Sequence, residues 1–427
     1  MVQHLAMVTT EILPPVSHPC AGGGVRIWGL GESLRRQGIS CTYFLPEGSP
    51  ADDKALNFIP HVFYQPEQLT EAITAAGCDA VLFEQWQPLT FVSAPLDIPV
   101  FVDLPGPLAL EYLWRDPDNF YQHVVDKVEC LSRADYFLCA HERQRGYYNA
   151  WLTWAGVDPA EGRIAAAPFV FHEMPISRQG HVEDEPLFFW GGMFWPWQDR
   201  TEAFETILKT LERIRRGQLV IVGVSGQSGS SGGLDSSYAD HPHVTWLGSL
   251  PFSEYVMELK RSAVAVDLCR PTEERRLSSD LRTGSALWSG TPCIVTPDSP
   301  WAAWIEECGG GWIVDYGDAK SLADLTEEIA LARVDIVAKR RGAKAISQRI
   351  SQDENVAHLV KWLNNPQKRR AAPDFFQARA QDRERRIRDM QKEIDRLRHE
   401  KNALQHDLDS IRSNPLFRLY KKACFWK

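Results

Sequence analysis

Short apolar runs alternate with amphipathic segments along most of the first 365 residues. Runs such as 79–83 and 218–223 are apolar at nearly every position, as strands of a parallel sheet are when both of its faces are covered. Segments such as 201–215 place apolar side chains three and four residues apart, which is typical of helices that cover a sheet. This alternation predicts an α/β fold with doubly wound parallel sheets.

The alternation forms two series, separated at residues 172–186, where His, Pro, Arg, Gly and acidic residues break the pattern and predict a linker. We therefore expect two Rossmann-like domains, residues 1–175 and 186–365, that face each other across a cleft. The helical region 334–364 is expected to pack back across the first domain. Strands are predicted at 4–10, 39–45, 79–83, 99–103, 136–140 and 163–168, and then at 187–192, 218–223, 244–248, 263–269, 292–296 and 312–314.

Composition excludes several classes of protein. No apolar run approaches the roughly 20 residues that span a bilayer, and the N-terminus lacks the basic region of a secretion signal. The 9 cysteines are an odd number without CxxC spacing, which predicts reduced core residues of a cytoplasmic protein. No His/Cys cluster indicates a metal, so neither a metal nor another cofactor is expected.

Charge is distributed unevenly along the chain. Residues 366–427 carry 17 Lys and Arg against 9 Asp and Glu, whereas the preceding residues carry 30 against 47. An acidic body is a poor nucleic-acid binder, so no nucleic acid is expected as a partner. The basic C-terminal region could instead attract an anionic partner or a membrane.

A coiled-coil helix is predicted at residues 366–412. Apolar residues keep heptad spacing from Ile387 to Ile411, about three and a half heptads, and Lys401 at an a position weakens this seam while restricting its register. The pattern favours a parallel homodimer through residues 380–412, with a single helix packed on its own body as the alternative. The charges that would face each other are Glu393, Glu400 and Asp407 at g and Arg398, Gln405 and Arg412 at e.

Residues 413–427 form a basic amphipathic tail. From 414 onwards the tail has four basic side chains, no acidic ones and six large apolar ones. This composition fits an interfacial helix that touches the inner face of the cell membrane. Docking on a partner or a frayed end are the alternatives.

A glycine loop follows the first predicted strand. Gly22, Gly23 and Gly24 precede Arg26, and a helix is expected from Ile27 onwards. Glycines allow backbone N–H groups and a helix N-terminus to approach an anion closely. The loop therefore predicts a phosphate site, with a plain turn as the alternative.

A charged loop follows the strand predicted at 263–269. It carries Glu274, Arg275, Arg276, Ser278 and Arg282 ahead of a predicted helix. Ligands of open α/β sheets bind beyond the carboxyl ends of the strands, and the arginine fork suits phosphate. Glu274 could accept hydrogen bonds from sugar or ribose hydroxyls, or pair with an arginine. Ser278 could bond a phosphate or cap a helix.

Five ordered segments resemble the GT-B glycosyltransferases of family 4, and the resemblance covers roughly residues 1–365. Residues 22–26 match the phosphate-side loop of the family. The other segments are 101–111, similar to DLxxPxxLE, 137–145, similar to FxCAxERQR, 190–199, similar to WGGxxxxWxD, and 274–282 with 287–292, similar to ExxxSxxxR and LWxGxP. The resemblance implies the GT-B fold and a retaining sugar transfer from a nucleotide diphosphate sugar.

Fixed cations and N–H donors near the departing diphosphate would act as electrostatic catalysts, and a carboxylate would orient or deprotonate the acceptor hydroxyl. On these grounds we expect Asp103, Glu274 and Arg282 to be catalytic. A structural role for His141 and core packing for the tryptophans are the alternatives. The expected donor phosphate ligands are Gly22, Gly23, Gly24, Arg26, Arg275, Arg276 and Ser278, and the expected acceptor or sugar contacts are Glu111, His141, Trp195 and Trp197.

The chain departs from the family pattern at three places. The Arg and Lys that usually follow the first strand of the second domain are replaced by a stretch with only Arg200 beyond it. The second glutamate of the donor motif falls at Ser285, and the histidine after the Asp103 strand is replaced by Pro105 or Gly106.

The sequence thus predicts a glycosyltransferase that acts on a glycan or lipid-linked acceptor in bacterial surface polysaccharide or glycolipid biosynthesis. A catalytically degenerate GT-B scaffold that recruits a partner enzyme through its coiled coil is the main alternative. A GT-B epimerase or phosphorylase is a third hypothesis.

Overall fold

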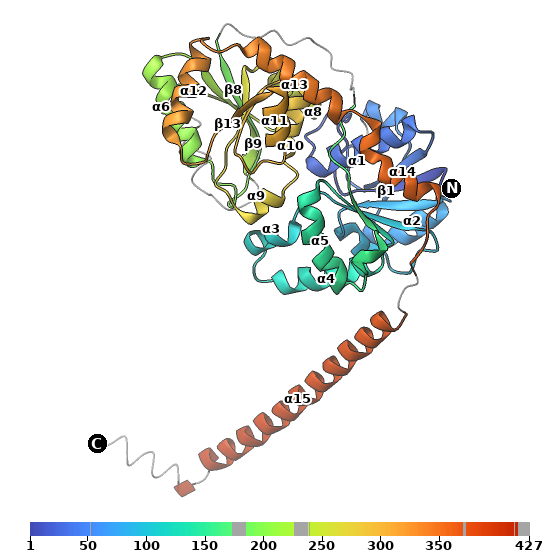
Figure 1. The fold of residues 1–427 in the computed structure, drawn as a ribbon. Helices are drawn as coiled ribbons and strands as arrows, with labels where there is room; N and C mark the ends of the chain where they lie inside the picture. Colours follow the sequence, from blue (N-terminus) through green and yellow to red (C-terminus); the bar gives the residue numbers. More distant parts are fainter. Residues whose placement is uncertain are drawn as a thin grey trace, which may run out of the picture. The chain divides into compact units, whose positions relative to one another are not determined.

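The computed structural model describes residues 1–51, 53–172, 185–225, 238, 240–369, 373–413 and 415–416 (Figure 1). They belong to two compact units, Met1–Arg369 and Arg370–Lys427. The predicted linker lies outside the described residues except at its ends, as do the Gly/Ser-rich stretch after residue 225 and most of the tail.

The first domain is built on a seven-stranded sheet with the order β3-β2-β1-β4-β5-β6-β7, and its neighbouring strands are parallel. Its strands are β1 His4–Val8, β2 Ser40–Pro46, β3 His61–Tyr64, β4 Ala80–Glu84, β5 Val100–Leu104, β6 Tyr136–Cys139 and β7 Ile164–Ala166. Its helices are α1 Gly22–Arg36, α2 Leu69–Ala75, α3 Leu108–Arg115, α4 Phe120–Ser132 and α5 Glu142–Trp154. Only β3 was not predicted, because this edge strand buries only Tyr64 and lacks the continuous apolar run of the covered strands.

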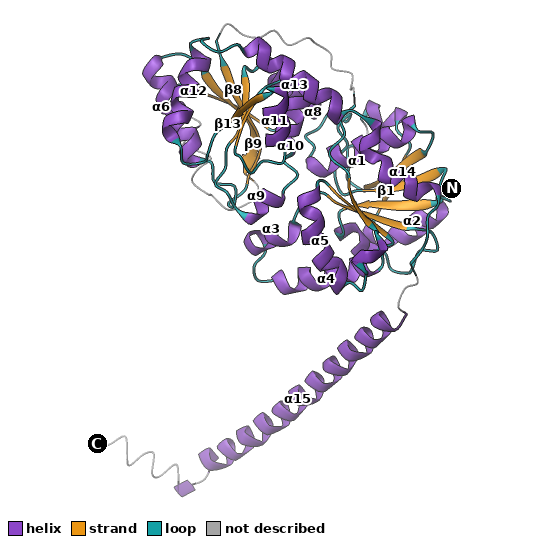
Figure 2. Ribbon diagram, in the orientation of Figure 1, coloured by secondary structure: helices purple, strands orange, loops and turns teal. Residues whose placement is uncertain are grey.

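The second domain is built on a six-stranded sheet with the order β10-β9-β8-β11-β12-β13, again with parallel pairs. Its strands are β8 Leu187–Phe194, β9 Gln218–Ser225, β10 Val244–Gly248, β11 Val264–Asp267, β12 Cys293–Val295 and β13 Gly311–Ile313. Its helices are α6 Thr201–Ile214, α8 Phe252–Arg261, α9 Glu273–Leu277, α10 Leu281–Ser289, α11 Ala302–Cys308, α12 Ala319–Ala330 and α13 Ile336–Ile350. Figure 2 shows the helices around both sheets.

The strand order reverses once in each sheet. In the first sheet the chain leaves β1 on one side and returns beside it at β4, and in the second it leaves β8 and returns beside it at β11. Ligands of such sheets bind outside the carboxyl ends of the strands at these reversal points. Glu84 ends β4 and Asp267 ends β11, so both lie at the two reversal points.

The chain returns to the first domain after α13, as the sequence predicts. Helix α14, Ala357–Asn364, buries Leu359 and Leu363 in the apolar core of the first domain. The backbone N–H of Val2 donates to the carbonyl of Leu363 across 2.8 Å. Helix α14 thus follows the second domain in the sequence but packs on the first domain, where it is hydrogen-bonded to the N-terminal segment (Figure 1).

The second unit contains α15, Pro373–Ser413, a single helix of 41 residues. The predicted seam is exposed on it, with Leu397 50% and Leu404 64% accessible. No helix among the described residues is long and apolar enough to cross a membrane.

We predict that Leu359→Ala lowers the free energy of unfolding by about 2–5 kcal/mol, because it leaves a cavity in the first-domain core. Lys361→Ala on the exposed face of the same helix is the matched control and should leave stability nearly unchanged. Urea denaturation followed by tryptophan fluorescence measures both. Equal midpoints for the two variants would contradict the proposed packing of α14.

Candidate functional site

A cavity of about 500 Å³ is lined by residues of both α/β domains. It brings together many of the residues that the sequence predicts for the site. These are Gly22, Gly23 and Glu111 from the first domain and Trp195, Glu274, Arg275, Ser278 and Arg282 from the second. Gly24, Arg26, Asp103, His141, Trp197 and Arg276 are not among its lining residues.

The glycine loop forms the first turn of α1, which begins at Gly22 and not at Ile27 as expected. A Cβ at Gly23 would lie 2.5 Å from Glu84 Oε1, and one at Gly24 would lie 2.0 Å from the carbonyl oxygen of Ile12. Only glycine therefore allows the helix to start this close to β4. Ala21 has no side-chain group that could cap the helix, and Gly22 and Gly23 of this uncapped first turn line the cavity.

Arg26 and Asp103 form a buried ion pair. Both side chains are fully buried, with Arg26 Nη2 2.8 Å from Asp103 Oδ1 and Nε 2.9 Å from Oδ2. Arg26 Nη1 donates to the carbonyl of Pro168. This geometry argues against the expected phosphate contact of Arg26 and the expected acceptor contact of Asp103, because each group is engaged with the other away from the cavity.

Arg275 is held by two carboxylates of the second domain. Its Nη2 lies 3.2 Å from Asp267 Oδ2 and 2.8 Å from Asp280 Oδ1. Burial alone would raise the pKa of Asp267, but Arg282 and Arg275 lower it below its usual range. Burial and the charge of Asp267 raise the pKa of Asp280. Arg275 therefore fixes the loop between β11 and α10 in place and lines the cavity with its charge already neutralised.

Arg282 pairs with Asp267 but keeps one donor without a hydrogen-bond partner among the described residues. Its Nη2 donates to Gln198 Oε1 at 2.7 Å, and Nη1 lies 3.5 Å from Asp267 Oδ1. Nη1 is buried and has no hydrogen-bond partner among the described residues. The guanidinium also lies over the Trp190 ring at 5.4 Å, which restricts its orientation.

Two further polar groups in the lining are buried without a partner. Glu274 is 7% exposed, and its Oε2 accepts no hydrogen bond from the part of the chain that the structure describes. Burial raises the pKa of Glu274 to about 7. The Ser285 hydroxyl, at the position of the missing second glutamate, is likewise buried and unpaired within those residues. Such groups are rare unless a ligand or water satisfies them.

The sequence did not single out Glu84. It lies at the end of β4 beside Gly23 and lines the cavity. Burial, Glu11 and Asp103 together raise the pKa of Glu84 to about 8, so it is largely protonated at neutral pH. A carboxyl at the end of an apolar strand run, next to the first strand, was the signal that could have identified it.

Of the two tryptophans predicted for the site, Trp195 lines the cavity and Trp197 packs behind it. Trp195 lies in the lining, with the Arg115 guanidinium 4.9 Å from its ring centre. Trp197 is buried behind it, and the two rings stack at 4.8 Å. Arg115 also pairs with Glu111 at 3.3 Å, and burial raises the pKa of Glu111.

His141 and Ser278 hold the domains together. His141 Nε2 lies 3.1 Å from the carbonyl oxygen of Ser278, and burial lowers the pKa of the imidazole. The Ser278 hydroxyl donates to the carbonyl of Arg275 and so ends α9. These contacts favour structural roles for both residues over the expected sugar and phosphate contacts.

Arg276 points away from the site. Its side chain is 57% exposed and pairs with Glu273 one helical turn away. This position argues against the expected phosphate contact of Arg276, because neighbouring residues on a helix point about 100° apart and Arg275 occupies the inward direction.

No protein-family model and no curated protein matches this sequence. Solved structures do match. Sucrose-phosphate synthase from Thermosynechococcus elongatus is 16% identical at a TM-score of 0.57, covering 85% of this chain and 98% of that chain. HepE from Anabaena, solved with UDP and glucose, is 14% identical at 0.59, covering 86% and 100%. TarM from S. aureus, solved with UDP among other ligands, is 10% identical at 0.58, covering 85% and 99%. These likenesses confirm the expected two-domain GT-B fold.

We predict that Glu84→Gln becomes more stable relative to the wild type as the pH rises from about 5 to 8. The pKa of Glu84 rises from 4.5 to about 8 on folding, so in this window the unfolded chain releases a proton that the folded chain keeps. The free energy of unfolding of the wild type therefore falls as the pH rises through this window. Glutamine does not ionise, so the Glu84→Gln variant lacks this decrease.

Urea denaturation over a pH series measures this difference. Glu254→Gln, at an exposed position of α8, is the control and should follow the wild type. A Glu84→Gln curve parallel to that of the wild type would show that Glu84 ionises normally in the folded chain.

Proposed function

Because the chain has the GT-B fold, we propose that it is a glycosyltransferase that moves a sugar from a nucleotide-sugar donor to a glycan or lipid-linked acceptor. The observation that carries the proposal is the meeting of two helix N-termini at the cavity. A Cβ at Gly22, the first residue of α1, would lie 3.2 Å from Leu281 Cδ2, and Leu281 is the first residue of α10. Arg282 follows directly.

This arrangement suits a diphosphate. Each helix N-terminus carries roughly half a positive charge and unpaired N–H groups, and together they favour an anion. Arg282, although paired with Asp267, adds a guanidinium donor, Nη1, that has no hydrogen bond among the described residues. As the bond between the anomeric carbon and the diphosphate breaks, the electron pair leaves with the diphosphate, and these groups stabilise the growing charge.

The remaining polar groups of the lining suit the sugars. Glu274 and Ser285 offer unpaired oxygens to donor hydroxyls, and Glu111 on the opposite domain can orient the acceptor hydroxyl whose oxygen attacks the anomeric carbon. Asp103 is assigned a positioning role, because with Arg26 it holds the first turn of α1. No metal is required in this scheme, since fixed positive charge is already present.

The stereochemistry, the donor sugar and the cellular role are proposed from the resemblance to the family 4 glycosyltransferases. We propose retention of configuration, a hexosyl donor and a role in bacterial surface polysaccharide or glycolipid assembly at the cytoplasmic face of the membrane, with residues 414–427 as a peripheral membrane contact. That HepE and TarM were solved with UDP supports a nucleotide-sugar donor. The degenerate scaffold stays the alternative, because the usual Arg and Lys after β8 are missing.

We predict that Arg282→Ala lowers the rate of sugar transfer roughly 10²–10³-fold with the fold intact, because it removes the main charge on the leaving group. Arg276→Ala, an exposed arginine in the preceding helix α9, is the matched control and should keep full activity. Turnover with a panel of nucleotide sugars and circular dichroism provide the measurements. Unchanged turnover in Arg282→Ala would refute the donor assignment, and calorimetry in which no nucleotide sugar binds would favour the scaffold.

We also propose that α15 forms a parallel homodimer through residues 380–412. Its seam is exposed from Ile387 to Ile411, and Glu393 at g would face Arg398 at e of the second copy. The exposed apolar stripe on a helix of 41 residues is difficult to explain without such a partner.

We predict that the wild-type chain sediments as a dimer and that Leu397→Glu/Leu404→Glu sediments at the monomer mass of 48.4 kDa. Charges at two d positions would be buried and would repel each other across the seam. Ala403→Glu, at the outward c position between them, should remain dimeric. A wild-type chain that is monomeric in analytical ultracentrifugation at micromolar concentration would refute the dimer.

A further inference from the structure

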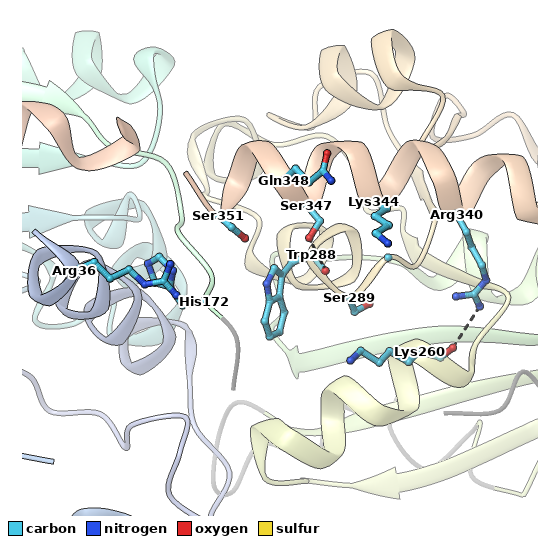
Figure 3. A pocket seen from close by; sticks show the side chains of 11 residues that line it. Arg36, His172, Lys260, Trp288, Ser289, Arg340, Lys344, Ser347, Gln348 and Ser351 are labelled. Carbon is cyan, nitrogen blue, oxygen red and sulfur yellow. Dashed lines mark hydrogen bonds between the residues drawn. The ribbon is translucent and has the colours of Figure 1, made fainter. Parts of the chain in front are cut away.

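A second cavity, of about 950 Å³, lies apart from the candidate active site and shares none of its lining residues (Figure 3). We call it the basic hollow. Arg36 and His172 line it from the first domain, and Lys260, Arg340 and Lys344 line it from the second. The other lining residues are Trp288, Ser289, Gly290, Ser347, Gln348 and Ser351, so no acidic residue is among them.

The basic hollow is positively charged, whereas the part of the chain that contains it is acidic. Residues 1–365 carry 47 acidic against 30 Lys and Arg side chains, yet the hollow gathers four Lys and Arg without a carboxylate in the lining. The ammonium groups of Lys260 and Lys344 form no ion pair with any residue that the structure describes. Like charges held together in this way repel one another unless an anion lies between them.

Helix polarity explains only part of the cluster. Arg36 and Lys260 lie in the last turns of α1 and α8, where cations are favoured. Arg340 and Lys344 lie one turn apart inside α13, where the helix dipole gives no such preference. Arg340 is further oriented because it donates to the carbonyl of Lys260 (Figure 3) and to that of Ser262.

His172 provides an independent observation. Its side chain is buried at 5% exposure, and Nε2 is hydrogen-bonded to the Ser33 hydroxyl at 2.7 Å. Nδ1 is buried and has no partner among the described residues. A buried ring nitrogen without a partner in the lining of a cavity is a group that a ligand or water would satisfy.

We propose that the basic hollow binds a phosphate-bearing anion that bridges the two α/β domains. Lys260 and Lys344 supply point charges, Arg340 and Arg36 supply guanidinium donors, and the anion is held between elements of both domains. The volume accommodates a diphosphate with an attached group. The shared chemistry fits either a soluble phosphorylated compound or a phospholipid headgroup. This site goes beyond the proposed sugar transfer and does not depend on it.

Isothermal titration calorimetry with inorganic pyrophosphate tests the proposal on the full chain. The wild type is expected to bind, and Lys260→Glu/Lys344→Glu is expected to bind roughly tenfold or more weakly, because two charge-assisted contacts become repulsive. Arg36→Glu changes the hollow from the other domain and should show a similar loss of binding. It keeps the proposal testable if the double variant does not fold. Lys361→Glu, an exposed charge reversal on α14, should bind as the wild type does.

Arg282→Ala separates this site from the candidate active site, because it should keep the part of the pyrophosphate signal that the double variant loses. Flotation with phosphatidylcholine vesicles, with and without phosphatidylglycerol, distinguishes the two sources. If the double variant also loses binding to the anionic vesicles, the ligand is a headgroup. If it loses only pyrophosphate binding, the ligand is soluble. A wild type that binds neither, or a double variant that binds both as the wild type does, overturns the proposal.

Discussion

The buried pair between Arg26 and Asp103 is the interaction on which the candidate site depends. Asp103 is at the carboxyl end of β5, and Arg26 lies in the second turn of α1, so the pair fixes the direction in which α1 starts. A buried ion pair is weak support for stability, but removing one partner leaves an uncompensated charge and costs about 3–5 kcal/mol. Its value here is geometric, because it places the N-terminus of α1 at the cavity.

The second domain has a similar arrangement of buried charges. Arg275 joins Asp267, at the end of β11, to Asp280, which directly precedes α10. In both domains an arginine and carboxylates thus hold a helix start beside the point where the strand order reverses. Arg26 balances Asp103, and Arg275 and Arg282 together balance Asp267 and Asp280, so what is left for a ligand is the two helix N-termini and the Arg282 Nη1 donor, which has no hydrogen bond among the described residues.

The alternation of apolar runs predicted nearly all strands and the return of the chain to the first domain, because periodicity reports burial directly. The alternation could not predict which side chains form ion pairs with one another. Arg26 and Asp103 lie 77 positions apart, and nothing local shows that a guanidinium after a glycine turn faces a carboxylate instead of a ligand. Arg275 and Arg276 are equivalent in sequence, yet the short helix α9 turns one inward and the other to solvent. Glu84 was missed for the same reason, since its burial beside Gly23 depends on the packing of α1.

The departures from the family pattern are better explained by a redistributed site than by a lost one. Arg200 does not replace the missing Arg and Lys, because its guanidinium is buried against the Trp190 and Phe194 rings and donates to the carbonyl of Gln198. A scaffold that had lost its ligand would have no reason to keep Glu274 Oε2 and the Ser285 hydroxyl buried and unpaired, since each such group costs about 1–3 kcal/mol. Glu274 in α9 and Ser285 in α10 line the same cavity as Arg282, which favours a chain that still binds a polar ligand there.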